Sequence, residues 1–343
     1  MRPSFYDHLH PPTIPAAQAR FRYTLGLGGL AVFLILVVGF TGILVTFFYI
    51  PTPEQAAKSV QQLAFLVPFG WLMRNLHYWS AQLLVLVAAL HLLRVVFTGA
   101  YLPPRRFNYL LGLSLLVICV LMDFTGYVLR WDEGVHWALV TGTNLVRSIP
   151  LIGEGFYTLV VGGSQVGAVT LIRFYAWHLF GLTLLLVAIG VWHIFRLRRD
   201  GGIAVPPPVQ RTDPARIPRS ELSRRESLAM LWATFILVVL AVVLPAPLAP
   251  AIQESTLAAS ESRAPWFFLW VQQLLRLGDP FIFGVLIPLC SLSLLALVPY
   301  ITPHRLLPSE LGRWFPRGGR NVQLMLAILA GLIILLTLLA LRS

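Results

Sequence analysis

Residues 74–94 read RNLHYWSAQLLVLVAALHLLR, and this stretch decides the fold. It is apolar and long enough to cross a bilayer, yet it opens with Arg-x-x-His and closes with His-x-x-Arg. Ionisable side chains inside a membrane segment are costly and mark functional sites. We therefore expect a bound group to engage His77 and His91, with Arg74 and Arg94 beside it.

The composition is that of an integral membrane protein. Of the 343 residues, 57% are hydrophobic and only 12% are charged, which is atypical of soluble domains. The net charge of +12 comes from arginines and a single lysine scattered between long apolar runs, so nucleic-acid binding is excluded. Cys119 and Cys290 lie in different apolar runs and no CxxCH motif occurs, so disulfides, iron-sulfur sites and covalent haem attachment are unsupported.

Seven apolar runs are long enough to span a bilayer. They cover residues 24–49, 77–98, 108–129, 174–196, 228–248, 281–301 and 321–341. We expect an all-α integral membrane protein with an N-terminal four-helix domain (1–205) and a C-terminal three-helix domain (206–343), divided by the proline-rich linker GGIAVPPPVQRTDPARIP. The N-terminal segment lacks the short apolar core of a cleavable signal, so the first run is expected to be retained.

The connections add two further expectations. The pieces WDEGVHWALV and APWFFLWVQQLLRL are amphipathic and are expected to form short helices on the membrane face. If the N-terminus lies on the same side of the membrane as the connections that follow the second, fourth and sixth spans, that side carries 18 of the 26 basic residues. This side is expected to be cytoplasmic, with the C-terminus on the opposite side of an energy-transducing membrane.

Histidines recur on two of the predicted spans. His77 and His91 are 14 residues apart, so they share one helix face and lie about 21 Å apart along the axis. His178 and His193 are 15 residues apart, about 60° from a common line but still on one broad face. Both spans run in the same direction, so His77 is expected at the depth of His178, and His91 at the depth of His193.

Two imidazoles that face each other across a bundle suit haem iron better than zinc, which prefers four tetrahedral ligands. The two histidine pairs therefore predict two non-covalent haem b groups. A macrocycle needs space on the other two helices, and glycines recur there at the same 14-residue interval, as Gly28 and Gly42 and as Gly112 and Gly126. Arg74 and Arg94 are placed to neutralise the haem propionates.

These motifs resemble cytochrome b of the quinol-oxidising cytochrome bc complexes, most closely the plastid-type form with its longer second histidine interval. The matching stretches lie between residues 20 and 300 and are GGLAVFLILVVGFTG, FGWLMRNLHYWSAQLLVLVAALHLLRVVFTGAY, FTGYVLRWD, VGAVTLIRFYAWH and APWFFLWVQQLLR. Plastid-type complexes divide this protein into a four-helix chain and a three-helix chain. Here the resemblance implies that both parts are fused.

The resemblance implies a role for each site. His77 and His178 would ligate an outer, low-potential haem b, and His91 and His193 an inner, high-potential one. A quinol-oxidation pocket would lie at the outer face near FTGYVLRWD and APWFFLW. A quinone-reduction pocket would lie near the inner haem, beside Arg224, Arg225 and Glu226. The implied partners are a Rieske-type iron-sulfur protein and a c-type cytochrome, in a homodimer.

Three positions depart from the family pattern. The family motif Pro-Glu-Trp-Tyr is here Ala264, Pro265, Trp266 and Phe267, so the glutamate expected to accept a quinol proton is missing. Arg130 replaces the proline of the Gly-Tyr-x-x-Pro-Trp turn. Leu34 stands where plastid-type chains carry a cysteine that tethers an extra haem, so no third haem is predicted.

Another group must then accept the quinol proton. The candidates at the outer face are Asp132, Glu133 and His136. Asp123 is a fourth candidate because an acid inside a membrane helix is functional by default. Its alternative role is a structural ion pair with Arg130.

Three functions remain open. The first is a di-haem cytochrome b subunit of a quinol:cytochrome c oxidoreductase coupled to proton translocation. The second is a di-haem anchor that exchanges electrons between quinone and a peripheral dehydrogenase or reductase. The third is a transporter whose histidines relay protons or bind metal. The additional three-helix half and the APWFFLW segment favour the first.

Overall fold

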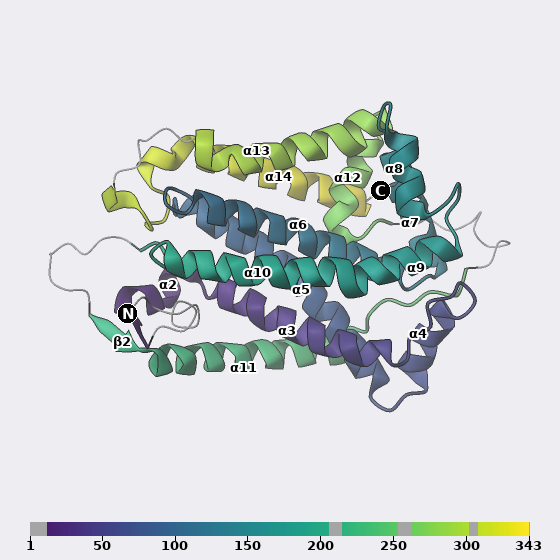
Figure 1. Cartoon of the computed structure of the whole chain (residues 1–343), viewed down its shortest axis with the longest axis horizontal. Helices are drawn as coiled ribbons and strands as arrows, with labels where there is room; N and C mark the ends of the chain where they lie inside the picture. The colour runs from purple at the N-terminus through teal and green to yellow at the C-terminus, as the bar shows by residue number, and fades with distance from the viewer. Residues whose placement is uncertain (1–11, 206–214, 253–262, 302–307, 343) are drawn as a thin grey trace.

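The computed structural model describes residues 12–205, 215–252, 263–301 and 308–342. Long helices lie side by side in an elongated bundle (Figure 1). Seven spans within these ranges are long and apolar enough to cross a membrane. They are α3 (Leu27–Thr46), α5 (Gly70–Phe97), α6 (Arg106–Val128), α9 to α10 (Ala168–Arg199), α11 (Arg219–Val243), η5 to α13 (Phe281–Ile301) and η7 to α14 (Arg317–Arg342). The chain is a multi-pass, all-α membrane protein, as predicted.

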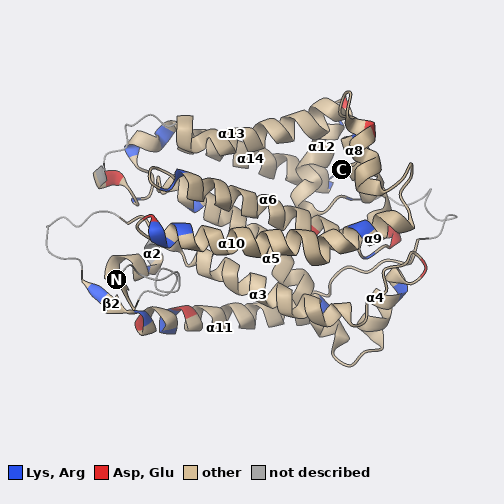
Figure 2. Cartoon of the chain, in the orientation of Figure 1, with Lys and Arg blue, Asp and Glu red and all other residues tan. Residues whose placement is uncertain are grey.

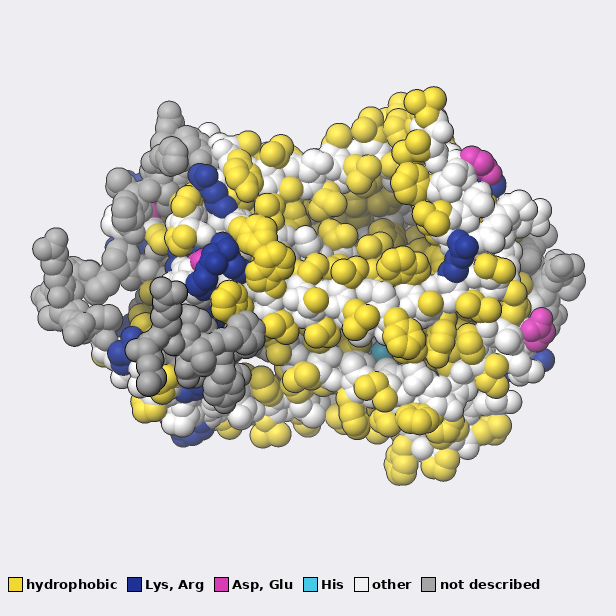
Figure 3. Space-filling view, viewed as in Figure 1, with side chains coloured by type: hydrophobic (Ala, Val, Ile, Leu, Met, Phe, Trp, Pro, Cys, Tyr) yellow, Lys and Arg dark blue, Asp and Glu magenta, His cyan; other side chains and the backbone are white. Residues whose placement is uncertain are grey.

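Charged side chains gather at the two ends of the bundle and are sparse between them (Figure 2). Hydrophobic side chains cover the middle of the face in Figure 3, and exposed ones include Phe40, Leu184 and Leu231. An apolar band between two polar ends is the surface that a bilayer requires. We call the end near α4, α7 and α8 the outer end, and the end near β1 and β2 the inner end.

Several helix boundaries differ from the predicted ones. The first span begins at Leu27 because Leu25 and Gly26 both have positive φ and separate it from α2 (Phe21–Thr24). The second begins at Gly70, seven residues before the predicted start. The fifth ends at Val243, since Pro245 and Pro247 follow and the residue before a proline disfavours helix.

Short elements cover both ends. The two amphipathic pieces form α7 (Glu133–Arg147) and the pair η4 (Trp266–Phe268) and α12 (Leu269–Leu275), as predicted. The sequence did not predict α4 (Ala56–Phe65), α8 (Gly153–Val161) or the antiparallel pairing of β1 (Thr13–Pro15) with β2 (Arg216–Pro218). Other short helices in the described ranges are η1 (Ala16–Ala19), η2 (Trp177–Gly181) and η6 (Pro308–Glu310).

The four-helix bundle packs as α3 on α5 and α6 on α10, with α5 against α6. Leu34, Leu84, Cys119 and Leu186 belong to one buried core cluster at mid-bundle. Around the bundle, α11 packs on α5 and α3, α14 on α12 and α5, and α13 on α6. Residues 206–214 of the linker lie outside the described ranges, and the division into two domains stays a prediction.

Candidate functional site

The structure brings the four histidines together as two pairs. The rings of His77 on α5 and His178 on η2 (Trp177–Gly181) lie with their centres 6.4 Å apart and their planes at 73°. Two imidazoles that bind one metal ion at about 2.0 Å place their ring centres roughly 6 Å apart. The second pair consists of His91 on α5 and His193 on α10, about four helical turns away.

Hydrogen bonds fix the tautomer of the outer pair. His77 Nδ1 lies 3.2 Å from the Val38 carbonyl and 3.2 Å from Thr41 Oγ1. His178 Nδ1 lies 3.1 Å from the Met122 carbonyl and 3.1 Å from Thr125 Oγ1. A carbonyl can only accept, so Nδ1 carries the proton and Nε2 keeps its lone pair for a metal ion.

The inner pair has fewer such contacts. His193 Nδ1 donates to the Asn108 carbonyl at 3.1 Å. His91 Nδ1 has no hydrogen-bond partner among the described residues. One inner histidine is thus fixed by a carbonyl, and within the described part of the chain neither has a threonine partner.

Each of the four glycines lies against one of the histidines. We measure the distance from a Cβ atom added to each glycine to the Cε1 atom of the neighbouring ring. At the outer level it is 3.0 Å for Gly42 and His77 and 2.8 Å for Gly126 and His178. At the inner level it is 3.1 Å for Gly112 and His193 and 3.5 Å for Gly28 and His91. Contacts below 3.4 Å are tighter than almost all real Cβ contacts. Gly42, Gly126 and Gly112 therefore leave room that a side chain would fill, whereas Gly28 lies at an ordinary contact distance from His91.

A π-helical turn aligns His178 with His193, the two histidines of the fourth span. His178 lies in η2, where one extra residue is accommodated within the helix, and Thr183 Oγ1 donates to the His178 carbonyl at 2.7 Å. The partner carbonyls of His178 and His193 belong to Met122 and Asn108, which are 14 residues apart on α6. The predicted offset of about 60° between His178 and His193 around the helix axis is therefore wrong, because the π turn accommodates the fifteenth residue of the interval.

The histidine pairs fit two bis-imidazole haem groups. Three of the four Nδ1 atoms donate to backbone carbonyls, the outer ring spacing matches one metal ion between two rings, and a glycine lies beside each ring. No group of three or more His, Cys, Asp or Glu side chains suited to a metal ion occurs in the described ranges. Paired ligands, with a macrocycle supplying the other four, are consistent with that result.

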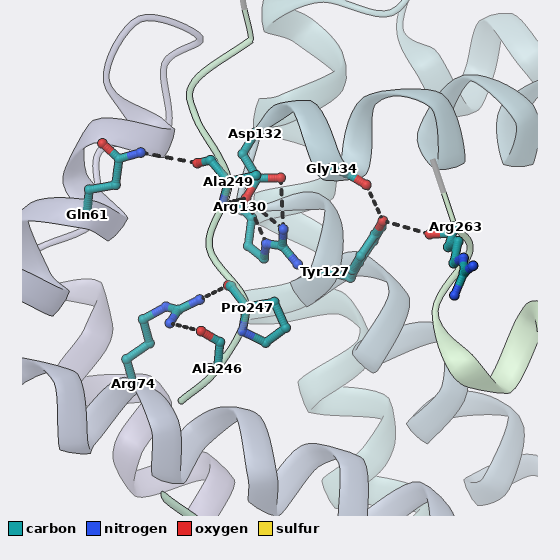
Figure 4. Close-up of polar contacts among 10 residues, drawn as sticks. All are labelled: Gln61, Arg74, Tyr127, Arg130, Asp132, Gly134, Ala246, Pro247, Ala249 and Arg263. Carbon is teal, nitrogen blue, oxygen red and sulfur yellow. Dashed lines mark hydrogen bonds and ion pairs between the residues drawn. The ribbon is translucent and has the colours of Figure 1, made fainter. Parts of the chain in front are cut away.

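Arg74 has a contact that the sequence did not predict. Its Nη1 donates to the Ala246 carbonyl at 3.0 Å, and its Nη2 donates to the Pro247 carbonyl (Figure 4). Arg94 is 6% exposed, near the inner end of α5. The propionate roles of Arg74 and Arg94 stay predictions, and two of the Arg74 donors already bind backbone.

Arg74 is one of several side chains that hold residues 244–252, which we call the outer strap. Trp79 Nε1 donates to Leu244 O at 2.7 Å, and Asn75 Oδ1 accepts from Ala246 N at 3.0 Å. Gln61 Nε2 donates to Ala249 O at 3.2 Å (Figure 4). Helices α4 and α5 thus fix the chain that leaves α11, although only the arginine stood out in the sequence.

Asp132 is a structural residue in this network. It is 2% exposed, and its carboxylate accepts from Arg130 Nε at 2.9 Å and Arg130 Nη2 at 2.7 Å (Figure 4). It also accepts from Ala249 N at 3.3 Å. The alternative ion pair of Asp123 with Arg130 is therefore wrong, since Arg130 pairs with Asp132.

Asp123 has different neighbours. It is buried on α6, and its Oδ1 accepts from Gln82 Nε2 at 2.8 Å. Gln82 Oε1 in turn accepts from Trp266 Nε1 at 2.7 Å. Asp123 Oδ2 has no hydrogen-bond partner among the described residues.

The segment Ala264–Phe267 lies against the four-helix bundle. Phe267 is 9% exposed and belongs to the buried core cluster, and the Phe268 ring meets the Phe124 ring edge to face at 5.6 Å. Pro265 O accepts from Phe268 N at 2.8 Å and starts the η4 turn. Pro265 and Phe267 thus shape the segment, and Trp266 is the side chain that reaches a polar partner.

Glu133 and His136 lie on α7 at the outer end. The Glu133 backbone N–H donates to Pro250 O at 3.0 Å and joins α7 to the outer strap. The His136 ring packs edge to face on Trp137 at 5.2 Å, and partial burial lowers the pKa of His136. A neutral His136 at pH 7 keeps a lone pair that can accept a proton.

The predicted inner cluster is arranged differently from the expectation. Arg224 and Arg225 both pair with Glu221, at 3.2 and 3.0 Å, on an exposed face of α11. Asp200 pairs with Arg196 and Arg199, each at 3.0 Å. These pairs mark the inner ends of α10 and α11, and a quinone pocket there stays a prediction.

The sequence did not predict the roles of Thr41, Thr125 and Gln82 or the π turn. The two threonines had a weak signal. The tripeptide Phe-Thr-Gly occurs at 40–42 and 124–126, where its glycine meets a histidine, but it occurs at 97–99 as well. Gln82 had none, since a single glutamine in an apolar run is compatible with many partners.

Comparison with known proteins agrees with this arrangement. The family model Cytochrome b/b6/petB matches residues 15–201. Cytochrome b6 of Synechococcus sp. (strain CC9605) is 39% identical over 175 residues, 51% of this chain and 80% of that protein. Cytochrome b6 of Heliobacterium modesticaldum is 38% identical over 192 residues, 56% of this chain and 88% of that protein.

A solved structure shares the whole fold. A chain of the structure titled Hyperthermophilic respiratory Complex III superimposes with a TM-score of 0.76 at 22% identity, covering 92% of this chain and 83% of that chain. This likeness extends over the C-terminal helices, which the family model does not reach. From the family match and the two relatives, this chain belongs to the cytochrome b/b6 family.

Proposed function

We propose that this chain is the di-haem cytochrome b subunit of a quinol:cytochrome c oxidoreductase of the bc type. The observation that carries the proposal is the pair of histidine levels, each with a glycine against every ring. Quinol oxidised at the outer end gives one electron to an iron-sulfur partner and one across the chain to quinone at the inner end. Protons leave at the outer side and are taken up at the inner side.

The residues that would hold the haems are the four histidines, His77 with His178 and His91 with His193. Haem b, when bound, supplies a one-electron carrier at each level. The chain fixes three of the imidazoles through carbonyls of α3 and α6, and it separates the two levels by about 21 Å along α5.

The outer quinol pocket would lie between the end of α6, the outer strap and η4. Tyr127 at the end of α6 donates to Gly134 O at 2.6 Å and reaches Arg263 O at 3.4 Å (Figure 4). These contacts join α6 to α7 and to the chain just before η4. Aromatic side chains on η4 and α6 give the pocket an apolar wall, which suits a quinone ring.

The chain needs partners to complete this reaction. The first electron requires a one-electron acceptor outside this chain, and we assign that role to a Rieske-type iron-sulfur protein that passes it to a c-type cytochrome. A homodimer within a larger complex, with the N-terminus in the cytoplasm, completes the proposal. The arginine distribution between the two sides supports that orientation.

Purification of the native complex through a tag on this chain tests the proposal. We expect two b haems per chain by pyridine haemochrome, two one-electron steps in a redox titration, and inhibitor-sensitive quinol:cytochrome c reductase activity. An iron-sulfur subunit of the Rieske type should co-purify. Well under two haems per chain would exclude both redox functions and leave the transporter.

One observation favours a second function, a di-haem anchor without bifurcation. Pro265 stands where the resemblance places the proton-accepting glutamate, so quinol oxidation needs another base. If two haems are found but only a flavin, molybdenum or nickel subunit co-purifies, the anchor is correct and the bc-type assignment is wrong.

A further inference from the structure

Asp123 lies in the membrane-spanning part of α6 with one carboxylate oxygen unsatisfied. It is 9% exposed, and Oδ2 has no hydrogen-bond partner among the described residues. Buried polar atoms in folded proteins are nearly always hydrogen-bonded, so an exception calls for an explanation. A carboxylate whose role was only structural would be expected to have both oxygens satisfied.

The other oxygen joins Asp123 to the segment on which the quinol pocket was placed. Gln82 on α5 donates to Asp123 Oδ1 at 2.8 Å and accepts from Trp266 Nε1 on η4 at 2.7 Å. The amide orientation is fixed at both ends, because an indole N–H can only donate and Gln82 must present its oxygen to it. The amide N–H₂ group then faces Asp123, where it stabilises the carboxylate form.

Asp123 is also better suited to accept a proton than the acid nearest to it along the chain. Asp132 accepts from two nitrogens of Arg130 and from the Ala249 N–H, and its protonation would break the ion pair that positions the outer strap. Asp123 has no such pair. The titratable groups that interact electrostatically with it are Tyr78 on α5 and Cys119 on α6 itself.

We propose that Asp123 accepts one of the two protons released by quinol oxidation at the outer end, and that Gln82 positions it toward Trp266. The inference rests on the proposed function. It assigns the base that Pro265 cannot provide, and it makes Gln82 a positioning residue of the reaction.

The proton and electron balance is complete. One quinol becomes one quinone and loses two electrons and two protons. One electron and one proton leave with the one-electron iron-sulfur acceptor, and the second electron enters this chain at the level of His77 and His178. The second proton binds Asp123 Oδ2 and converts the carboxylate to the neutral acid. It then leaves toward the outer end, in the direction of Tyr127, which lies one helical turn further along α6.

The test compares quinol oxidation by the purified complex in four variants. Asp123→Asn keeps the shape and the Gln82 contact but cannot take up the proton, and we expect quinol oxidation to fall about 100-fold. Asp123→Glu keeps the carboxylate and should restore most of the rate. Gln82→Leu should lower the rate about 10-fold, as expected for loss of a hydrogen bond to a charged group.

The matched control is Glu154→Gln, an exposed outer-end acid that pairs with Arg147 at 2.8 Å and has no part in the pocket. It should keep the wild-type rate. The pH–rate profile separates a proton-accepting role from a structural one. The rise of the rate with pH should disappear in Asp123→Asn and move to higher pH in Gln82→Leu, since the amide that stabilises the carboxylate is lost.

The outcomes are distinct for the two proposals. A wild-type complex with two haems and no quinol oxidation overturns the proposed function. An active wild-type complex in which Asp123→Asn keeps both haems, the wild-type rate and the wild-type pH profile overturns only the role of Asp123. If Asp123→Asn loses haem, Asp123→Glu is used in its place. The pH–rate profile of Asp123→Glu must then differ from that of the wild type, and an identical profile overturns the role of Asp123.

Discussion

The outer and inner histidine levels share one design but differ in how firmly the chain holds the rings. Both outer rings donate to a carbonyl and lie 3.1–3.2 Å from a threonine hydroxyl. At the inner level His193 has a carbonyl partner, and His91 Nδ1 has none in the part of the chain that the structure describes. The glycines are also closer to the outer rings. A Cβ atom added to the glycine would lie 3.0 and 2.8 Å from the outer rings, and 3.5 and 3.1 Å from the inner rings.

This difference shows how one pattern of histidines and glycines can form two sites whose imidazoles differ in hydrogen bonding. A hydrogen bond from Nδ1–H to an acceptor makes the imidazole a more basic ligand and favours the oxidised metal. On these contacts we expect the outer site, when it holds haem, to give up its electron more readily than the inner site. An electron that enters at the outer end would then move inward.

The largest expected effect comes from removing a ligand at one level. His91→Leu should lower the haem content from two to one per chain and leave the outer haem spectrum unchanged, because the levels are about four helical turns apart. His77→Leu should do the reverse. Haem stoichiometry and low-temperature absorption spectra check both variants, and loss of neither haem in either variant contradicts the assignment.

The glycine contacts predict a smaller and unequal effect. In Gly126→Ala the new methyl group would lie 2.8 Å from His178 Cε1, whereas in Gly28→Ala it would lie 3.5 Å from His91, an ordinary contact. Overpacking costs about 1–3 kcal/mol, so Gly126→Ala should weaken haem retention roughly 5- to 150-fold.

Gly28→Ala serves as the matched control and should retain both haems at the wild-type ratio. Haem loss to an apoprotein acceptor, followed for the two spectra separately, measures the difference. Equal loss rates from the two variants would show that the contact distances do not set haem retention.

The threonine contacts predict an effect on potential alone. Thr41→Val and Thr125→Val each remove one acceptor from an outer Nδ1–H while the carbonyl partner remains. One hydrogen bond contributes about 1 kcal/mol, equivalent to roughly 40 mV for a one-electron couple. Each change should raise the outer midpoint potential by up to that amount.

The inner potential should stay constant in both variants. Ser114→Ala is the control, because its hydroxyl donates only to Leu110 O on its own helix. A redox titration that shows the inner potential moving instead would reverse the assignment of the two levels.

The sequence predicted the parts of the fold that follow from hydropathy and period. Seven spans appear at the expected places, because bilayer thickness sets their length. The boundaries were less predictable. The start of α5 at Gly70 depends on Arg74, Asn75 and Trp79 reaching the outer strap, and such contacts between distant segments leave no periodic signal.

The site was predictable where it depends on spacing. The 14-residue interval predicted that His77 and His91 share a helix face, and the common direction of the two spans predicted which histidines share a level. The 15-residue interval was misjudged because a π turn is not visible in a hydrophobic pattern. The link from Trp266 through Gln82 to Asp123 joins α6, α5 and η4. It required the tertiary structure, since the three residues are far apart in the sequence.

The smallest predicted effect concerns His136 on α7 at the outer end. Burial lowers its pKa in the folded protein, while the unfolded value is about 6.5. The unfolded chain therefore binds the proton more readily, and the stability that the neutral ring contributes is present above about pH 6.5 and is lost as the pH falls below it. His136→Gln should reduce the decrease in thermal midpoint between pH 7 and pH 5 by about 1–2 °C. A variant with a steeper decrease than the wild type would contradict the direction of the shift, and no comparable change is expected in haem content at either level.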